Sequence, residues 1–345
     1  MKKSFALSLA ILFWHCTSLY SQVNRVDSFE VRLNDYLLNL SKLENLLEID
    51  GQFAQGVFIV EEFQSQQEME LNDFERKINS LTDFIIEQYN TNSLKKYRQP
   101  DSINYLKNLT LFKMIFDSVL VNSNASSKTK LISFSYYNDD AIGKANALVV
   151  DLLETGKGDC HSLSYLYKII ADKIGAKCWF ALAPNHIYIK NFSEQYGWYN
   201  TELTSRSFPS DAWIMASGYI SADAIRSKIY MDTLSNQQSI GLCVLDLAKA
   251  YEYETKNYYD GFILKCCDLV LEYHATNPMA LLLKAETLKK VYLKQKNENA
   301  PTARQAYDDM EAAYITLAKL HYREMPKEMY DKWVKQIQHS SGQPK

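Results

Sequence analysis

Hydrophobic residues recur at three- and four-residue steps along most of the chain, which is the spacing of a helix with one buried face. This pattern occupies the region before residue 130 and returns after residue 240, so both ends of the chain are predicted to be helical. The short apolar run from Gly56 to Val60 fits no period and is left unassigned. The helical stretches run from Val31 to Leu43, Phe74 to Tyr89, Leu106 to Val121, Leu242 to Tyr253, Tyr259 to Tyr273 and Met279 to Leu293.

A further helix is predicted to begin at Cys160, in the middle of the chain. Asp159 is a favoured N-cap residue, apolar residues follow at helical spacing, and Gly175 is placed to end the helix in a left-handed turn. Cys160 then lies in the first turn. The unpaired backbone N–H groups and the positive dipole end there favour its thiolate form. The same N–H groups are suited to bind a developing oxyanion.

Two strands are predicted after this helix, separated by a polar turn. His186 lies on the first strand, and Asn200 and Glu202 share one face of the second. If Lys190 pairs with Trp198, Glu202 faces His186; a slip of two residues would bring Asn200 opposite His186 instead. Either side chain is able to accept the imidazole N–H, so the sequence leaves the choice open.

A cysteine at a helix start, a histidine on a strand and an acid or amide on the next strand stand in the order of a thiol acyl-transfer triad. Cys160 is the candidate nucleophile and His186 the candidate base. Attack on an amide would form a thioester. Water would release an acid, as in a protease or amidase, and an amine would give transamidation; the sequence does not choose between them.

Two aromatic residues are candidates for the substrate cleft. Tyr188 shares a strand face with His186, and Trp213 lies in the stretch from Phe208 to Tyr219, which is predicted to be a loop near the mouth of the cleft. Trp213 is interpreted either as the wall of a subsite or as a structural plug. A short helix is predicted after this loop, with Ser221 as its cap.

The central motifs resemble those of the transglutaminase-like superfamily, whose core has a papain-like fold. The family pattern is a glycine, a variable residue and a cysteine opening a helix, then a histidine, then an acid, a variable residue and a threonine. Here these are Gly158–Cys160, His186 and Glu202–Thr204, within residues 135 to 225. The resemblance implies that Glu202 orients His186. The family usually has Asp at this position, which leaves Asn200 open as the partner.

The fold class expected from this resemblance is α+β, with a papain-like core flanked by helices. The C-terminal helices, with a cap and first-turn proline at Asn277–Pro278, resemble tetratricopeptide repeats, which implies binding of a peptide or partner protein. The expected division is a signal peptide (1–21), an N-terminal helical region (22–130), the transglutaminase-like core (131–235) and a helical tail (236–340).

The N-terminus is predicted to direct export. Lys2 and Lys3 precede an apolar run from Phe5 to Trp14, and cleavage is expected after Ser21. The run is too short to span a bilayer. The mature protein is therefore expected in the periplasm or outside the cell, without a membrane span.

Charge and composition exclude some partners. The formal net charge of the 345 residues is −3 and no basic cluster is present, so nucleic acid is not an expected partner. No cofactor is implied. A zinc site built from Cys160, Cys178 and His186 would lack the closely paired ligand spacing of structural zinc sites, so no metal is expected.

The cysteine pattern fits a free reactive thiol. Cys160 belongs to an odd set after removal of the signal peptide. Cys178 opens an apolar strand and is interpreted as a core residue. Cys243 could pair with Cys266 or Cys267 if their helices pack as a hairpin.

A second hypothesis belongs to another functional class. The core could be a catalytically degenerate domain that acts as a periplasmic protein-binding module, with the helical tail holding the partner. Loss of partner binding on deletion of residues 240 to 345, without thiol reactivity at Cys160, would favour this alternative.

Overall fold

The structure is a computed structural model. It describes residues 32–64, 71–94, 96–116, 119–122, 129–137, 148–326, 328–329 and 332. The predicted signal peptide over residues 1–21 lies outside the described residues.

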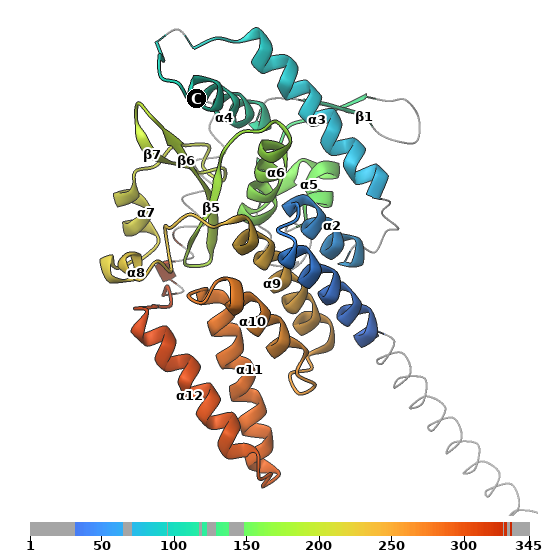
Figure 1. The fold of residues 1–345 in the computed structure, drawn as a ribbon, viewed down its shortest axis with the longest axis vertical. Coiled ribbons are helices and arrows are strands. Elements are labelled where there is room, and N and C mark those ends of the chain that lie inside the picture. The colour runs from blue at the N-terminus through green and yellow to red at the C-terminus, as the bar shows by residue number, and fades with distance from the viewer. Residues whose placement is uncertain are drawn as a thin grey trace, which may run out of the picture.

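Helices and small sheets alternate along the described chain, which confirms the α+β class (Figure 1). A first helix covers residues 32–48. The other helices are α2 (Phe53–Gln64), α3 (Leu71–Thr91), α4 (Ser102–Phe116), α5 (Val149–Thr155), α6 (Cys160–Lys173), α7 (Asp211–Ser217), α8 (Ala222–Arg226), α9 (Asn236–Thr255), α10 (Phe262–Tyr273), α11 (Pro278–Asn297) and α12 (Ala303–Lys319). The strands are β1 (Val119–Asn122), β2 (Thr129–Ile132), β3 (Ser135–Tyr136), β4 (Lys157–Gly158), β5 (Trp179–Ala183), β6 (His186–Ser193) and β7 (Gly197–Thr201).

The N-terminal region differs from the prediction in two places. The unassigned run from Gly56 to Val60 is helical and lies within α2. The helix expected to reach Val121 ends at Phe116, and β1 then pairs antiparallel with β2.

The central sheet is antiparallel in the order β5-β6-β7, and α6 packs against β6. Its register differs from both registers considered for the sequence: Lys190 pairs with Asn200, not with Trp198. The cause is a tight turn. Ser193 pairs with Gly197, whose positive φ of 73° closes the hairpin in a conformation that glycine adopts without strain.

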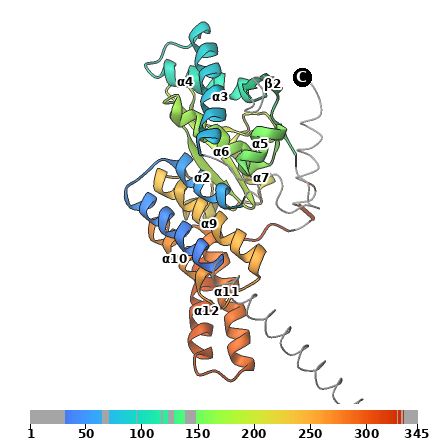
Figure 2. The ribbon, with the colours of Figure 1, turned by 90° about the vertical axis from the view of Figure 1, so that its right-hand side faces the viewer.

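The helices before residue 64 pack on the core and on the C-terminal helices together. In α2, Phe53 contacts the rings of Tyr165 and Phe180, with centroids 4.9 and 5.1 Å apart. At Gly56, an added Cβ would lie 3.2 Å from the sulfur of Cys243 on α9. Figures 1 and 2 show α2 between the sheet-bearing core and α9. One buried hydrophobic cluster therefore runs through all three regions expected from the sequence, from Tyr36 to Leu283.

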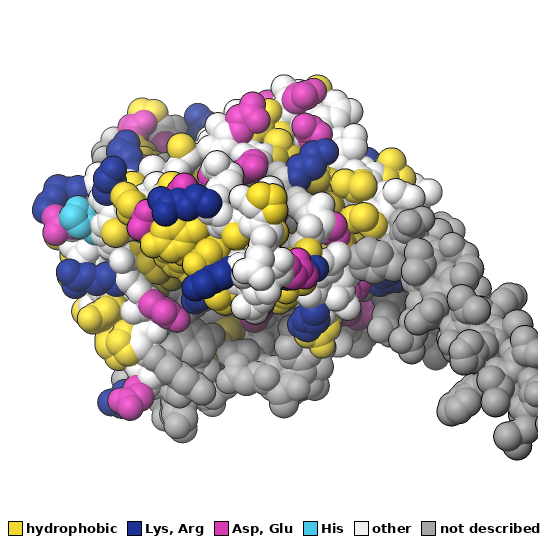
Figure 3. Space-filling model, turned by 90° about the horizontal axis from the view of Figure 1, so that it is seen from below, with side chains coloured by type: hydrophobic (Ala, Val, Ile, Leu, Met, Phe, Trp, Pro, Cys, Tyr) yellow, Lys and Arg dark blue, Asp and Glu magenta, His cyan; other side chains and the backbone are white. Residues whose placement is uncertain are grey.

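The C-terminal helices pack in sequence, each against the next, from α9 to α12. Asn277 caps α11 through the N–H groups of Met279 and Ala280, and Pro278 occupies the first turn as predicted. In the view from below, positively and negatively charged side chains are mixed with hydrophobic ones (Figure 3). The described cysteines are free thiols, so the optional bridge from Cys243 is not formed.

The stretch after β7 is more ordered than predicted. The expected loop from Phe208 to Tyr219 contains helix α7, whose N-cap Ser210 accepts a hydrogen bond from the N–H of Trp213. Ser221 caps α8 as predicted. No helix within the described ranges is long and apolar enough to cross a membrane.

Candidate active site

Cys160 occupies the first position of α6, as predicted, because a capping box begins the helix there. The Asp159 carboxylate accepts hydrogen bonds from the N–H groups of His161 and Ser162, and the Ser162 hydroxyl accepts one from the Asp159 N–H. At Gly158 an added Cβ would lie 2.3 Å from the Ser162 hydroxyl oxygen. The glycine before the cysteine is therefore needed for the close approach of the loop to the first turn.

His186 begins β6 directly after a two-residue turn. Ala183 and His186 pair across the β5–β6 hairpin, and Pro184 and Asn185 connect them. Asn185 has a φ of 54°, and proline followed by a residue with positive φ is typical of a type II turn. The turn places the imidazole at the end of the sheet, where its ring stacks on that of Tyr188 with centroids 6.2 Å apart.

Glu202 is the partner of His186. The Glu202 Oε2 atom lies 2.6 Å from His186 Nε2, and the two residues are only 3% and 9% exposed. The other oxygen, Oε1, accepts hydrogen bonds from the Thr204 N–H at 3.0 Å and the Thr204 hydroxyl at 2.7 Å. The carboxylate is thus held from one side by Thr204 and directed at the imidazole from the other.

The observed register explains how Glu202 reaches the imidazole. Continued by one residue beyond the pair Ile189–Thr201, it sets Glu202 opposite Tyr188, so that His186 is a diagonal neighbour on the same face. A long side chain spans a diagonal of this kind. Backbone hydrogen bonds between Glu202 and Ser207, at 2.9 and 3.0 Å, fix the chain where it leaves β7.

Asn200, the alternative partner for His186, makes its contacts elsewhere. Its side-chain amide donates to the Pro209 carbonyl at 3.1 Å and to Asp211 Oδ1 at 2.7 Å. The register places Asn200 opposite Lys190, four residues along the strand from the His186 position that the alternative required. Asn200 instead links β7 to the beginning of α7.

Cys160 interacts with the same imidazole as Glu202. It is half-buried, and its charge and a hydrogen bond to it both act on His186 to raise the pKa of the imidazole. Because Glu202 engages Nε2, we assign the interaction with Cys160 to Nδ1. The structure therefore brings together the three residues Cys160, His186 and Glu202.

The electrostatics of the pair favour its charged form. Burial alone lowers the pKa of His186, but the charges of Glu202 and Cys160 and their hydrogen bonds outweigh it, so the pKa is raised. Burial alone raises the pKa of Glu202, but the imidazolium charge and the donors of His186 and Thr204 outweigh it, and the pKa is lowered. Both pKa shifts show that an imidazolium beside a carboxylate is the favoured form of the pair.

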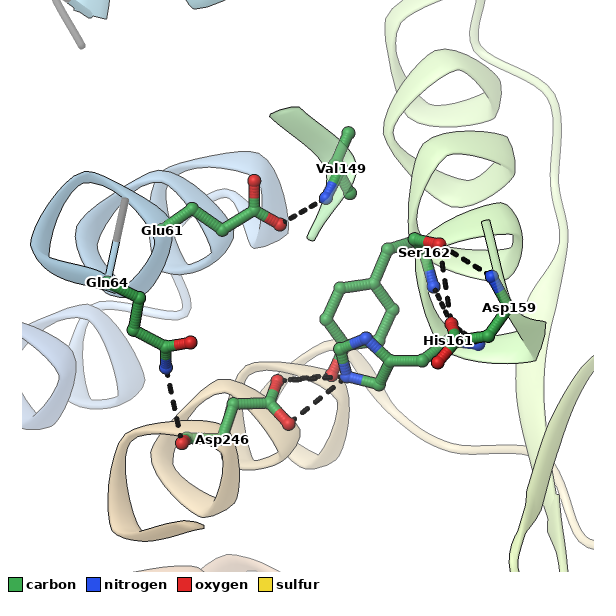
Figure 4. A network of polar contacts seen from close by, with 8 residues as sticks. Glu61, Gln64, Val149, Asp159, His161, Ser162 and Asp246 are labelled. Carbon is green, nitrogen blue, oxygen red and sulfur yellow. Dashed lines mark hydrogen bonds and ion pairs between the residues drawn. The ribbon is translucent and has the colours of Figure 1, made fainter. Parts of the chain in front are cut away.

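The residue after Cys160 is held by α9, the first of the C-terminal helices. His161 Nε2 lies 3.1 Å from both carboxylate oxygens of Asp246 on α9, and the Tyr165 hydroxyl donates to the same carboxylate at 2.9 Å (Figure 4). Gln64 on α2 donates to the Asp246 carbonyl at 3.4 Å. The first turn of α6 is therefore joined to α9, and α9 is joined in turn to α2.

A second contact holds α5, the helix that precedes Cys160 in the chain. Glu61 on α2 accepts hydrogen bonds from the N–H groups of Val149, at 2.6 Å (Figure 4), and of Val150, at 2.9 Å. It caps α5, because the N-cap residue itself, Leu148, has no polar side chain. Burial raises the pKa of Glu61 to about 8. In the sequence, Glu61 is visible only as an acid at the end of the apolar run that begins at Gly56.

The contribution of the Asp246 contact to the free energy of unfolding is large enough to measure. Asp246→Ala is expected to lower the free energy of unfolding by about 1–2 kcal/mol, since it leaves His161 and the Tyr165 hydroxyl without their acceptor. Asp246→Asn keeps one carbonyl oxygen for Tyr165 and should lose less. Urea unfolding of the three proteins measures the difference, and equal midpoints with equal slopes would contradict the assignment.

The remaining candidates have different surroundings from those expected. Tyr188 is fully buried, so it supports the imidazole and does not line an open cleft. Trp213 is 44% exposed on α7, which disfavours its interpretation as a structural plug. Cys178 is buried in the core as predicted, and burial raises the pKa of its thiol to about 12. Within the part of the chain that is described, no three His, Cys, Asp or Glu side chains are grouped to hold a metal ion.

Comparison with known proteins identifies no relative. No protein-family model matches the chain, and no curated protein and no solved structure matches it. A functional conclusion therefore depends on the geometry of the site.

Proposed function

We propose that the protein is a cysteine-dependent acyl-transfer enzyme of the transglutaminase-like type, with Cys160 as nucleophile, His186 as acid and base, and Glu202 as the orienting acid. The observation that carries the proposal is the buried contact of 2.6 Å between His186 and Glu202, beside a cysteine in the first turn of a helix. Burial of an imidazole and a carboxylate costs free energy, and a site that needs a charged pair accounts for it.

The reaction follows from these positions. The Cys160 thiolate attacks the carbonyl carbon of an amide, a C–S bond forms and the carbonyl π electrons move to oxygen. As the oxyanion collapses, the C–N bond breaks and the leaving amine or ammonia takes a proton from His186. Water or a second amine then gives a proton to His186 and attacks the thioester, and the C–S bond breaks to restore the thiolate. Glu202 keeps the imidazole oriented throughout.

The capping box restricts the donors available to the oxyanion. The N–H groups of His161 and Ser162, which the sequence offered for this role, are used by Asp159. The N–H of Cys160 is the donor of the first turn that this cap leaves unused. It lies on the nucleophile itself, as one oxyanion donor does in serine proteases.

The proposal extends to location and partners. The apolar run from Phe5 to Trp14 supports export to the periplasm or the medium. A peptide or protein amide is the proposed substrate. The succession of packed helices from α9 to α12 offers a surface for a protein partner.

A direct test uses a glutamine-containing peptide, with and without a fluorescent primary amine. The wild-type protein is expected to release ammonia, and incorporation of the amine distinguishes transamidation from hydrolysis. Cys160→Ala should reduce ammonia release to background. Cys178→Ala, the same substitution at a thiol outside the site, should retain it. Undiminished release by the folded Cys160→Ala protein would refute the assignment.

The alternative, a binding module without catalysis, predicts a different outcome. Its thiol at Cys160 would react as an ordinary cysteine, and no amide would be cleaved. Removal of residues 240 to 345 would abolish partner binding. Against it, a degenerate site has no need to keep the buried charges of His186 and Glu202 in contact.

A further inference from the structure

A separate cavity of about 300 Å³ lies between α4, α6 and the hairpin that ends in β7. Neither Cys160 nor His186 is among its lining residues. Five aromatic side chains form most of its wall, and we refer to them as the aromatic cage. They are Tyr105, Tyr167, Tyr196, Tyr199 and Phe208.

Neighbouring rings of the aromatic cage are tilted relative to one another. Tyr196 and Tyr105 have centroids 5.9 Å apart with planes at 47°, and Tyr105 and Tyr199 have centroids 6.1 Å apart at 68°. Tyr199 and Phe208 follow at 6.0 Å and 65°. With interplanar angles of this size, the rings surround a space and do not form a parallel stack. Tyr167 is fully buried at the base.

The cage is braced from behind, so its rings are held in position before a ligand arrives. Tyr97 stacks on Tyr105 with centroids 4.5 Å apart and planes at 4°. The Tyr97 hydroxyl lies 2.6 Å from Asp101 Oδ1 and 2.9 Å from the Ser193 hydroxyl. On the opposite wall, Phe112 packs on Phe208 with centroids 4.5 Å apart. Preorganised walls lower the entropic cost of binding.

The side chains of Asn108 and Thr201, which line the cavity, already form hydrogen bonds with protein groups. The Asn108 amide donates to the carbonyls of Asn104 and Lys177, each at 3.1 Å, and its oxygen accepts from the Tyr167 hydroxyl. The Thr201 hydroxyl accepts from Asn191 at 2.8 Å. Among the described residues that line the cavity, none carries a charge. Apart from the tyrosine hydroxyls, the lining therefore offers few acceptors, and a ligand rich in N–H or O–H groups would lose hydrogen bonds to water on entry.

One chemical group suits such a cavity. A quaternary ammonium carries a positive charge but no N–H group, and the negative faces of aromatic rings attract it. Burial raises the pKa of Tyr199 above its ordinary value, so this ring stays a neutral phenol, and the carboxylate of Asp101 is near enough to act on it. From this geometry we propose that the aromatic cage binds a quaternary ammonium group. The proposal is independent of the acyl-transfer reaction.

Choline and 3,3-dimethyl-1-butanol test the proposal, because they have the same shape and differ in charge. Calorimetric titration of the full-length mature protein should show choline binding at least about tenfold more tightly than the neutral alcohol, as cation–π attraction in a desolvated site predicts. Equal affinities, or no binding of either, would overturn the proposal. A parallel assay with phosphatidylcholine vesicles distinguishes a lipid headgroup from a free solute, as only a headgroup site retains the protein on vesicles.

Matched substitutions locate the binding. Tyr196 is 61% exposed at the rim, so Tyr196→Leu removes a ring without opening the core. It is expected to weaken choline binding several-fold, while Tyr196→Phe, which keeps the ring, binds within about twofold of the wild type. Tyr199→Leu and Tyr199→Phe repeat the comparison inside the cage. Unchanged choline affinity in both folded leucine variants would overturn the proposal. Cys160→Ala should bind choline normally, which separates this site from the catalytic one.

Discussion

Iodoacetamide is expected to alkylate Cys160 at pH 6 about ten times faster in the wild-type protein than in the His186→Ala variant. The raised pKa of His186 keeps the imidazole positively charged at this pH, and that charge beside the sulfur favours the thiolate. An ordinary thiol with a pKa near 8.5 is less than about 1% ionised at pH 6. The lower intrinsic nucleophilicity of a stabilised thiolate removes part of this advantage, which leaves about one order of magnitude.

Two controls separate the ion pair from general loosening of the fold. His186→Gln supplies an amide that is able to donate to Glu202 but carries no charge, so it should react as slowly as His186→Ala while keeping more of the stability. Cys178 is buried, and mass spectrometry should find it unlabelled in every folded variant. If Cys160 is labelled at the same rate in the wild type and both His186 variants, and the rate follows an ordinary thiol titration, the triad is not assembled. That result would favour the alternative of a binding module.

Glu202→Gln is expected to lower the free energy of unfolding by about 3 kcal/mol or more, the cost of breaking a buried ion pair by removing one charge. The loss should depend on pH. The raised pKa of His186 contributes stability below its unfolded pKa of about 6.5, and this is lost as pH rises toward the folded value. The lowered pKa of Glu202 contributes stability above its unfolded pKa of about 4.3, and this is lost as pH falls. The difference should therefore be largest between about pH 4.3 and 6.5.

Urea unfolding at several pH values measures this difference, and Glu61→Gln is the matched control. Glu61 is also buried, but burial raises its pKa to about 8, so its carboxyl group loses stabilising effect as pH rises from about 4.3 toward 8. The stability of the wild type relative to Glu61→Gln should thus fall steadily over that range, with no maximum at mildly acidic pH. A loss in Glu202→Gln that is constant with pH would show that the pair is not ionised in the folded protein.

Features that depend on neighbouring residues were predictable. Asp159 as the cap, Cys160 as the first helical residue and Gly175 as the left-handed end of α6 all agree with the structure. The same is true of Asn277 at the beginning of α11. In each case the side chain and the backbone groups that it satisfies lie within one or two turns, so the sequence contains both partners of the interaction.

Features that depend on distant pairing were predicted less well. The order of Cys160, His186 and an acid could be recognised in the sequence. The choice between Glu202 and Asn200 depended on the strand register, and both predicted registers differ from the observed one. The register follows from the turn closed at Gly197, and many turns are compatible with one polar stretch. Only with the hairpin in place does Glu202 become a diagonal neighbour of His186.

By itself, the sequence determined the α+β class, the beginning of the helix that carries Cys160 and the candidate residues of the triad. The tertiary structure decided that Glu202 and not Asn200 meets His186, and that Glu61 and Asp246 hold the segments on either side of Cys160. Glu61 lies 88 residues from Val149, and Asp246 lies 85 residues from His161. Contacts over such separations leave no periodic pattern in the chain, because they arise only when helices packed by their apolar faces bring polar side chains together.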